Sequence, residues 1–325
     1  MTLCTPLTAY LGLTVPIISA PMAGIAGGAL AAAVSRAGGL GLIGGGYGVR
    51  AWIEQEFDLA GDTGVGIGFI TWSLVANPDL LQVALERRPK AIMLSFGDIR
   101  PFASKVAQAG IPLIAQVQTV SDAQIAVAEG ADIIVAQGGT EAGGHGGKRA
   151  TMALVPAVVD AVGSTPVVAA GGIADGRGLA AALMLGACGA LCGTAFYASR
   201  ESLAHSNAKK AAIAASGDDT VKGNVFDTIR GHDWPEPWAL RTLRNEFFER
   251  WAQAPGQLDQ AIPTAGQAFS DAQATGDTSI VRVIVGEAID MVTQSETAGI
   301  TVEQIVREAE KRLTMYCCSP AMALS

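Results

Sequence analysis

Eight short apolar runs, none of which alternates with polar residues, constrain the fold of this chain more than any other feature. They lie at Val15–Ser19, Leu40–Ile43, Val65–Phe69, Ala91–Leu94, Pro112–Ala115, Ile133–Ala136, Pro166–Ala169 and Ala190–Cys192. Continuous apolar runs of about four to six residues are typical of strands that are buried on both faces of a parallel sheet. Successive runs are roughly 20 to 34 residues apart, which leaves room for a helix between each pair of strands.

Helix-like stretches do separate these runs. They cover Ala29–Ala37, Ala51–Glu56, Pro78–Glu86, Pro101–Ala109, Ser121–Glu129, Ala153–Val162 and Arg177–Leu185. Gly38, Gly110, Gly130 and Gly186 each follow one of them directly, and glycine just past a helix is the expected left-handed cap. Eight strand–helix units in succession predict an α/β fold, a (β/α)8 TIM barrel, rather than a doubly wound sheet. The first turn lacks the GxGxxG pattern of a Rossmann fold.

The texture of the sequence changes near Ser216. The following stretch is more polar and holds three of the five tryptophans and four prolines. We expect residues 217–285 to form a small appended helical cap domain. Helical spacing predicts a helix over Leu240–Gln253, and Ile280–Val285 is expected as a returning strand or extended arm.

The rest of the chain divides around this cap. We expect residues 1–216 to form the barrel and residues 286–325 to form a C-terminal segment. Thr301–Leu313 has the pattern of an amphipathic helix, which we expect to pack back on the barrel.

Charge and cysteine content restrict the partners and the compartment. The 325 residues include 22 basic and 30 acidic side chains, a net charge of −8, which argues against nucleic-acid binding and against an anionic membrane surface. The two stretches poor in charge are broken by proline or glycine, so we expect neither a signal peptide nor a membrane span. Five cysteines, two of them adjacent at Cys317 and Cys318, make a poor disulfide framework and favour a reducing, cytoplasmic location. No cysteine or histidine cluster has zinc spacing, so no metal is expected.

The segment after the sixth apolar run is the richest in candidate chemistry. Between Gln137 and Lys148, six glycines surround His145, with Glu141 nearby. Catalytic groups of such barrels lie at the carboxyl ends of the strands. A histidine there can act as a base or as a cationic partner of an anion. The alternative is an ordinary histidine in a flexible surface loop.

Glycine turns follow the seventh and eighth runs. Gly171, Gly172 and Ile173 follow the seventh, and Gly193 and Thr194 follow the eighth. Barrels often bind phosphate between these two loops, through backbone amides, so the pair predicts a phosphate site. Ordinary turn chemistry is the alternative. Met22 and Gln116 follow or end other runs and can line the barrel mouth, although ordinary packing or loop polarity explains each of them better when it is taken alone.

Taken together, Pro21–Gly24, the Gln137–His145 loop, Ala169–Gly178 and Gly193-Thr194 resemble the nitronate monooxygenase family, formerly called 2-nitropropane dioxygenases. The resemblance covers nearly the whole chain. It implies a barrel that holds non-covalent FMN under the cap and oxidises a small nitronate with O2 to a carbonyl compound and nitrite. It does not give the oligomeric state, and a homodimer is one arrangement to test.

The resemblance also implies roles for single residues. Met22, Ala23 and Gly24 would line the flavin, and Gln116 would lie near its pyrimidine edge. The loop residues Gly138, Ala142, Gly143 and Gly144 would lie beside it. Its phosphate would be held by Gly171, Gly172, Ile173, Gly193 and Thr194. His145 matches the active-site histidine. If protonated it would favour a bound nitronate, and if neutral it would remove the α-proton of a nitroalkane.

Two departures from the family pattern stand beside this resemblance. The common loop has one residue between Gln-Gly and Glu-Ala-Gly-Gly-His, whereas this chain has Gly139 and Thr140, which puts the role of Gln137 in doubt. Gln116 cannot supply the positive charge of a lysine, so a reduced, anionic flavin would be less favoured.

Three other functions remain open. An NAD(P)H-dependent reductase of quinones or enoyl thioesters would use the same flavin site. An inosinate-dehydrogenase-like barrel would share the double-glycine turn, but it needs a cysteine after the sixth strand, and none lies between Cys4 and Cys188. A non-catalytic flavin- or phosphate-binding module is the third.

Overall fold

A closed barrel of eight parallel strands forms the body of the protein. The computed structural model describes residues 3–317. The strands pair in the order β1 (Ile17–Ser19), β2 (Leu40–Gly44), β3 (Gly66–Ile70), β4 (Ile92–Ser95), β5 (Leu113–Val117), β6 (Ile133–Gln137), β8 (Val167–Ala170) and β9 (Ala190–Cys192), with β9 pairing back to β1. Each of the eight apolar runs contributes one strand, so the predicted TIM barrel is confirmed.

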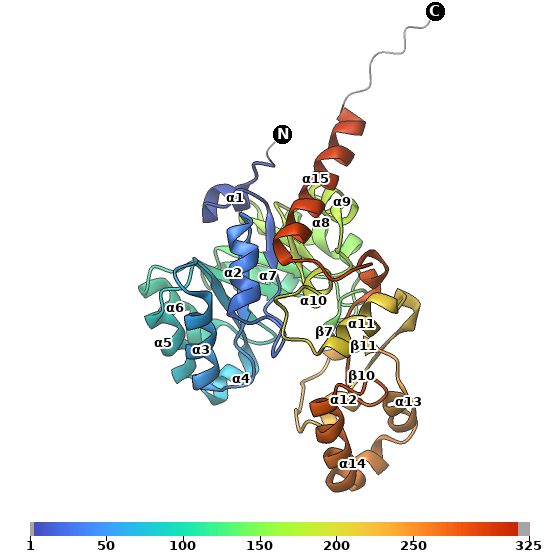
Figure 1. Cartoon of the computed structure of the whole chain (residues 1–325). Helices are drawn as coiled ribbons and strands as arrows, with labels where there is room; N and C mark the ends of the chain where they lie inside the picture. Colours follow the sequence, from blue (N-terminus) through green and yellow to red (C-terminus); the bar gives the residue numbers. More distant parts are fainter. Residues whose placement is uncertain (1–2, 318–325) are drawn as a thin grey trace, which may run out of the picture.

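Helices surround the barrel, as Figure 1 shows. They are α2 (Gly28–Arg36), α3 (Arg50–Ala60), α4 (Thr71–Ala76), α5 (Asp79–Glu86), α6 (Arg100–Gln108), α7 (Val120–Ala128), α8 (Thr151–Val162), α9 (Gly176–Met184), α10 (Thr194–Tyr197) and α11 (Ser206–Ala214). The four glycines expected as caps, Gly38, Gly110, Gly130 and Gly186, all have positive φ, between 67° and 94°. Only glycine adopts this conformation without strain, so the caps end these helices as the sequence predicts.

The strands read as continuous apolar runs because both of their faces are buried. One face packs inside the barrel, where Ile18, Leu42, Met93 and Val135 belong to one buried cluster. The other face packs under the helices. Leu7 of the first helix, α1 (Pro6–Leu11), joins the interior cluster and closes the end of the barrel opposite the cap (Figure 1). Each such side chain contributes about 1.5–3 kcal/mol when buried.

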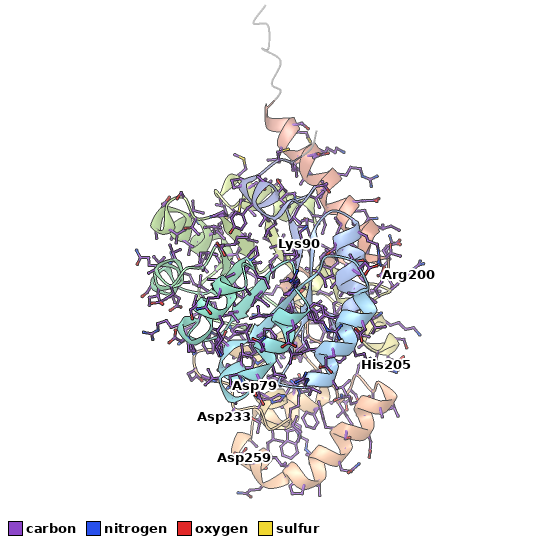
Figure 2. All side chains as sticks on the ribbon, turned by 90° about the vertical axis from the view of Figure 1, so that its left-hand side faces the viewer. Asp79, Lys90, Arg200, His205, Asp233 and Asp259 are labelled. Atoms are coloured by element: carbon purple, nitrogen blue, oxygen red, sulfur yellow. The ribbon has the colours of Figure 1, made fainter. Side chains whose placement is uncertain are left out.

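A smaller cap lies below the barrel in two views at right angles (Figure 1 and Figure 2), with Asp233 and Asp259 on it. Its elements are η1 (Gly217–Asp219), β10 (Thr220–Gly223), α12 (Val225–Thr228), β11 (Ala239–Leu243), α13 (Glu246–Ala252) and α14 (Pro255–Thr275). The cap has its own buried aromatic cluster, which includes Phe226, Phe247, Phe248 and Trp251. It is therefore a packed unit that does not depend on the barrel core alone.

The cap is only partly helical. Its strands β10 and β11 form an antiparallel sheet whose third strand, β7 (Gly144–Gly146), comes from the barrel loop that carries His145. The predicted helix over Leu240–Gln253 is wrong in its first part, because Leu240 and Thr242 alternate with half-buried residues on β11. The helix α13 begins only at Glu246. The sheet ties the cap to the candidate catalytic loop.

The chain returns to the barrel after the cap. Residues 282–286 form neither helix nor strand, so no strand is found at Ile280–Val285, and Leu243 N donates to Val283 O at 2.8 Å. After η2 (Glu287–Met291), the helix α15 (Ala298–Cys317) packs on α9 and α2 through Val302, Ile305 and Ala309, as expected for the final helix. No helix in residues 3–317 is long and apolar enough to cross a membrane. Cys318 lies outside the described residues.

Candidate active site

A large cavity opens at the carboxyl ends of the barrel strands, where the barrel faces the cap. The empty space inside it, open mouth included, is about 1220 Å³. Most residues proposed from the sequence line it: Met22, Ala23, Gln116, Ala142, Gly143, Gly144, His145, Gly171, Gly172, Ile173, Gly193 and Thr194. The cavity therefore brings together segments that are far apart along the chain.

Gly24 and Gly138 do not line this cavity. Gly24 has a φ of +71° in the turn after β1, with open space where a side chain would begin. Gly138 lies against the backbone and side chain of Thr151, the first residue of α8, where a Cβ atom would clash. The positive φ of Gly24 and the close approach of Gly138 to Thr151 explain why glycine stands at these positions. Neither glycine contributes to the lining of the cavity.

His145 lies on β7 and is only 8% exposed. Its Nε2 is 2.9 Å from Oδ2 of Asp227, which is also buried. The indole of Trp234 stacks on the imidazole, with ring centroids 3.3 Å apart and an interplanar angle of 9°. Burial lowers the pKa of His145, and the hydrogen bond to Asp227 and the charge of its carboxylate only partly oppose this effect.

These contacts define the protonation of the ring. A neutral imidazole whose Nε2–H donates to a carboxylate has an unprotonated Nδ1. This Nδ1 has no hydrogen-bond partner among the residues that the structure describes, and His145 lines the cavity. The arrangement suits a general base that takes a proton at Nδ1 while Asp227 stabilises the resulting imidazolium.

Asp227 was missed in the sequence. It lies at the end of the cap helix α12, 82 residues from His145. No local motif marks it, because its neighbours in sequence are ordinary cap residues. The pairing of β11 with β7 brings the cap to the histidine loop.

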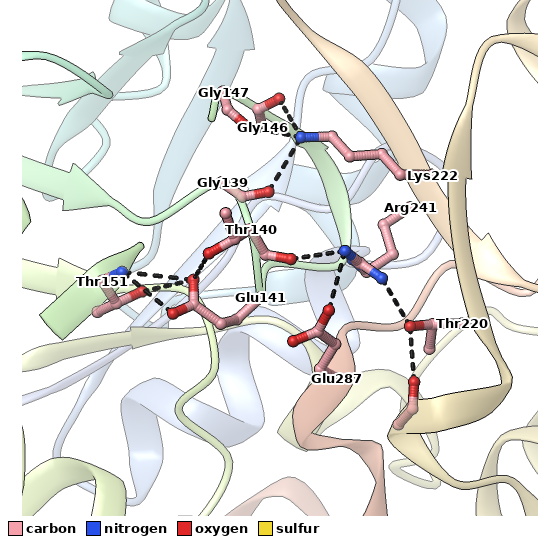
Figure 3. A network of polar contacts seen from close by, with 11 residues as sticks. Gly139, Thr140, Glu141, Gly146, Gly147, Thr151, Thr220, Lys222, Arg241 and Glu287 are labelled. Atoms are coloured by element: carbon pink, nitrogen blue, oxygen red, sulfur yellow. Dashed lines mark hydrogen bonds and ion pairs between the residues drawn. The ribbon is translucent and has the colours of Figure 1, made fainter. Parts of the chain in front are cut away.

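The histidine loop is held by charged side chains of the cap sheet (Figure 3). Lys222 Nζ donates to the carbonyls of Gly139, Gly146 and Gly147 at 3.0, 2.7 and 2.6 Å. Arg241 Nη2 donates to the carbonyl of Thr140 at 2.6 Å (Figure 3). The carbonyls of both residues in the longer loop, Gly139 and Thr140, are thus satisfied. The cap thereby accommodates the extra residue without displacing His145 from the cavity.

On the barrel side, Glu141 anchors the same loop. Its carboxylate accepts from the backbone N and the hydroxyl of Thr151 at 3.2–3.4 Å. Figure 3 shows both anchors on one stretch of chain. Carboxylate acceptors at a helix start are stabilising because the first amides there have no partner within the helix.

The two glycine turns have the geometry of an anion cradle. Gly171 and Gly172 have φ values of +96° and +71°, and both line the cavity with Gly193 and Thr194. A Cβ atom at Gly171 would clash with the carbonyl oxygen of Gly138. Glycine turns after the last two barrel strands suit a phosphate held by backbone amides, and the residues present fit that of a nucleotide cofactor.

Two arginines that sequence reasoning also missed bring positive charge to the cavity. Arg230 and Arg282 both line it, and within residues 3–317 the Nε of Arg282 has no hydrogen-bond partner. Burial, together with the nearby charge of Arg230, lowers the pKa of Arg282 to about 10. Arg230 lies over the ring of Tyr47 at 5.3 Å. Neither arginine forms an ion pair within 4 Å in the part of the chain that the structure describes, and such positive charge favours an anionic ligand.

A closed barrel with glycine turns after its last two strands and a buried histidine that lines the cavity defines an enzyme of the (β/α)8 class. A family model described as nitronate monooxygenase matches residues 5–60 and 72–308. The chain belongs to the nitronate monooxygenase family, and it is an oxidoreductase.

Individual relatives agree with this assignment. The chain is 33% identical to nitronate monooxygenase npaC of Metarhizium robertsii over 92% of both chains. It is 30% identical to a probable nitronate monooxygenase of Staphylococcus haemolyticus, over 95% of this chain and 98% of the relative.

Among solved structures, FabK from Thermotoga maritima superimposes with a TM-score of 0.84 at 30% identity, covering 97% of this chain and 98% of FabK. Nitroalkane oxidase from Streptomyces ansochromogenes gives a TM-score of 0.81 at 27% identity, covering 95% and 99%. The barrel and the cap are thus shared over almost the full length of both neighbours.

Proposed function

We propose that the protein is an FMN-dependent nitronate monooxygenase that oxidises alkyl nitronates with O2 to a carbonyl compound and nitrite. The observation that carries the proposal is the position of His145, which lines the cavity and pairs through Nε2 with Asp227, while burial lowers its pKa. The family of the chain supports the same reaction.

FMN is the cofactor that the cavity fits best. Gly171, Gly172, Gly193 and Thr194 would hold its phosphate through the backbone of two turns. Met22, Ala23 and Ile173 would line the bound group, as would Ala142, Gly143 and Gly144. When bound, FMN supplies the redox chemistry, while the protein supplies orientation and electrostatics.

Different residues of this chain bind the substrate and remove its proton. Arg230 and Arg282 attract an anionic nitronate by their charge. A protonated His145 is not needed for that attraction, and the lowered pKa supports its other role, removal of the α-proton of a neutral nitroalkane at Nδ1. Trp234 covers one face of the imidazole and keeps water from it.

The cap supplies much of this substrate side. Asp227, Arg230, Trp234 and Arg282 all fall within residues 217–285, which supports treating that range as a substrate domain beside a barrel of residues 1–216 and a C-terminal segment of residues 286–325. We also infer a cytoplasmic protein from the poor disulfide framework, and a homodimer is the assembly to test by sedimentation.

Anaerobic titration of the purified protein separates this function from a reductase. Propionate 3-nitronate should bleach the flavin absorbance, and O2 should restore it with release of nitrite. NADH should bleach the flavin slowly or not at all. Rapid bleaching by NADH together with no reaction with the nitronate would replace the proposal by the NAD(P)H-dependent reductase, and no bleaching by either compound would favour a non-catalytic flavin-binding module.

A further inference from the structure

Three glutamine side chains meet at the carboxyl ends of β5 and β6. Gln137 Oε1 accepts from Gln116 Nε2 at 2.9 Å and from Gln118 Nε2 at 2.6 Å. Gln137 Nε2 donates to the backbone carbonyl of His145 at 3.1 Å. Trp238 of the cap donates its indole N–H to Gln118 Oε1 at 2.6 Å. The cluster connects the cap, the histidine loop and the cavity.

The orientation of these amides follows from the two ends of the chain of hydrogen bonds. A backbone carbonyl can only accept, so the atom of Gln137 that faces His145 must be its nitrogen, and its oxygen must then receive both other glutamines. An indole N–H can only donate, which independently requires the oxygen of Gln118 to face Trp238. The two ends require the same arrangement, so none of the three amides can flip without losing a hydrogen bond.

Gln116 and Gln137 of this cluster both line the cavity, and Gln116 brings to it an atom that the cluster leaves unpaired. Its nitrogen is held by Gln137, and its Oε1 has no partner among the residues in the described part of the chain. Gln116 lines the cavity, whereas Gln118 does not. The fixed group at this point of the cavity is therefore an amide carbonyl, a hydrogen-bond acceptor.

The position of Gln116 relates it to the phosphate cradle. Gln116 is on β5, while the glycine turns follow β8 and β9, two and three strands away around the barrel. A ligand anchored at the turns that extends across the mouth reaches Gln116 with its far edge. An acceptor there selects a ligand that carries an N–H group on that edge.

We propose that Gln137 is a positioning residue that fixes the carbonyl of Gln116 toward the cofactor and so selects the imide N–H of a flavin ring. The inference rests on the proposed function, because it assumes a flavin in the cavity. It assigns Gln137 a role in spite of the longer loop. The amide of Gln137 holds the backbone carbonyl of His145 and also orients the amide of Gln116, whose oxygen then faces the edge of the ligand. Gln137 is 8% exposed and uses both atoms of its amide for this.

The test compares the dissociation constants of FMN and of FMN methylated on its imide nitrogen, measured by fluorescence with apoprotein reconstituted from each variant. One hydrogen bond is worth about 1 kcal/mol, so the native protein should prefer FMN about fivefold or more. Gln137→Met releases the amide of Gln116 and should bring the ratio close to one. Gln118→Met is the matched control, because it removes a neighbouring amide but leaves the bond between Gln116 and Gln137, and it should keep the native ratio.

The ratio separates positioning from a general loss of structure, since partial unfolding weakens both ligands alike. A native ratio in Gln137→Met, or an equal fall in Gln118→Met, would overturn the inference. Equal binding of both flavins by the native protein would overturn it while leaving the cofactor in place. Failure of the native protein to bind either flavin would instead remove the proposed function, and this inference with it.

Discussion

Replacing Asp227 by asparagine isolates the role of the carboxylate beside His145. Asp227 Oδ2 lies 2.9 Å from His145 Nε2, and both side chains are buried. An asparagine oxygen can still accept the hydrogen bond, but it cannot balance the charge of an imidazolium. Both the hydrogen bond and the charge of Asp227 raise the pKa of His145, so the variant should lower that pKa further and weaken the base.

The size of the effect follows from the charge-assisted hydrogen bond. Such a bond is worth about 1.5–3 kcal/mol and the neutral bond that the asparagine keeps about 0.5–1.5 kcal/mol. The difference of about 1–1.5 kcal/mol corresponds to a loss of about 5- to 13-fold in kcat/KM for a neutral nitroalkane. The preformed nitronate needs no proton removal and should lose much less. His145→Ala should show the lowest kcat/KM for the nitroalkane, because a general base contributes about 10²–10⁴-fold to the rate.

Oxygen consumption with a nitroalkane and with its own nitronate measures the two cases. Asp233→Asn is the matched control. It removes the same charge from the same cap, but at an exposed carboxylate (Figure 2). An equal loss with both substrates, or no loss with the nitroalkane, would refute the assignment of His145 and Asp227 as a base and its partner.

Other residues give independent predictions. Arg282→Met should raise KM for nitronates several-fold without lowering the melting temperature, because it removes a charge with no close partner; an unchanged KM would exclude Arg282 from substrate binding. Lys222→Met should lower the free energy of unfolding by about 2 kcal/mol in urea, because it removes three hydrogen bonds to the histidine loop; native stability would contradict that anchoring. Burial lowers the pKa of His232 to about 4. Since the unfolded chain protonates first, stability should fall as the pH drops from about 6.5 toward 4. The melting temperature of His232→Gln should depend less on pH over this range, and equal slopes would argue against the shift.

The barrel was predictable because its signal is local. Each strand is buried on both faces, so a continuous apolar run such as Ile133–Ala136 marks it without knowledge of its partners. The glycine turns are equally local, since Gly171 and Gly172 need positive φ where they stand. His145 could be placed at the mouth of the barrel because it follows a strand at the catalytic face.

The cap side of the site was not predictable in the same way. Asp227, Arg230 and Trp234 come to His145 only through the pairing of β11 with β7. The strand β7 is the sequence Gly-His-Gly, which has no apolar pattern. Over the few residues of β11, the spacing of Leu240 and its charged neighbours fits a helical period as well as the alternation of a strand, so the sequence predicts a helix there. Long-range pairing of short segments leaves no mark that one sequence can show.

The most direct test of the central claim is the visible spectrum of the purified protein together with the identity of the flavin that it releases. The account predicts a flavin absorbance, release of FMN on denaturation, and much weaker binding of riboflavin, because the phosphate is the anchor at Gly171, Gly172, Gly193 and Thr194. A colourless protein that does not take up added FMN, or one that binds riboflavin as tightly as FMN, would contradict it.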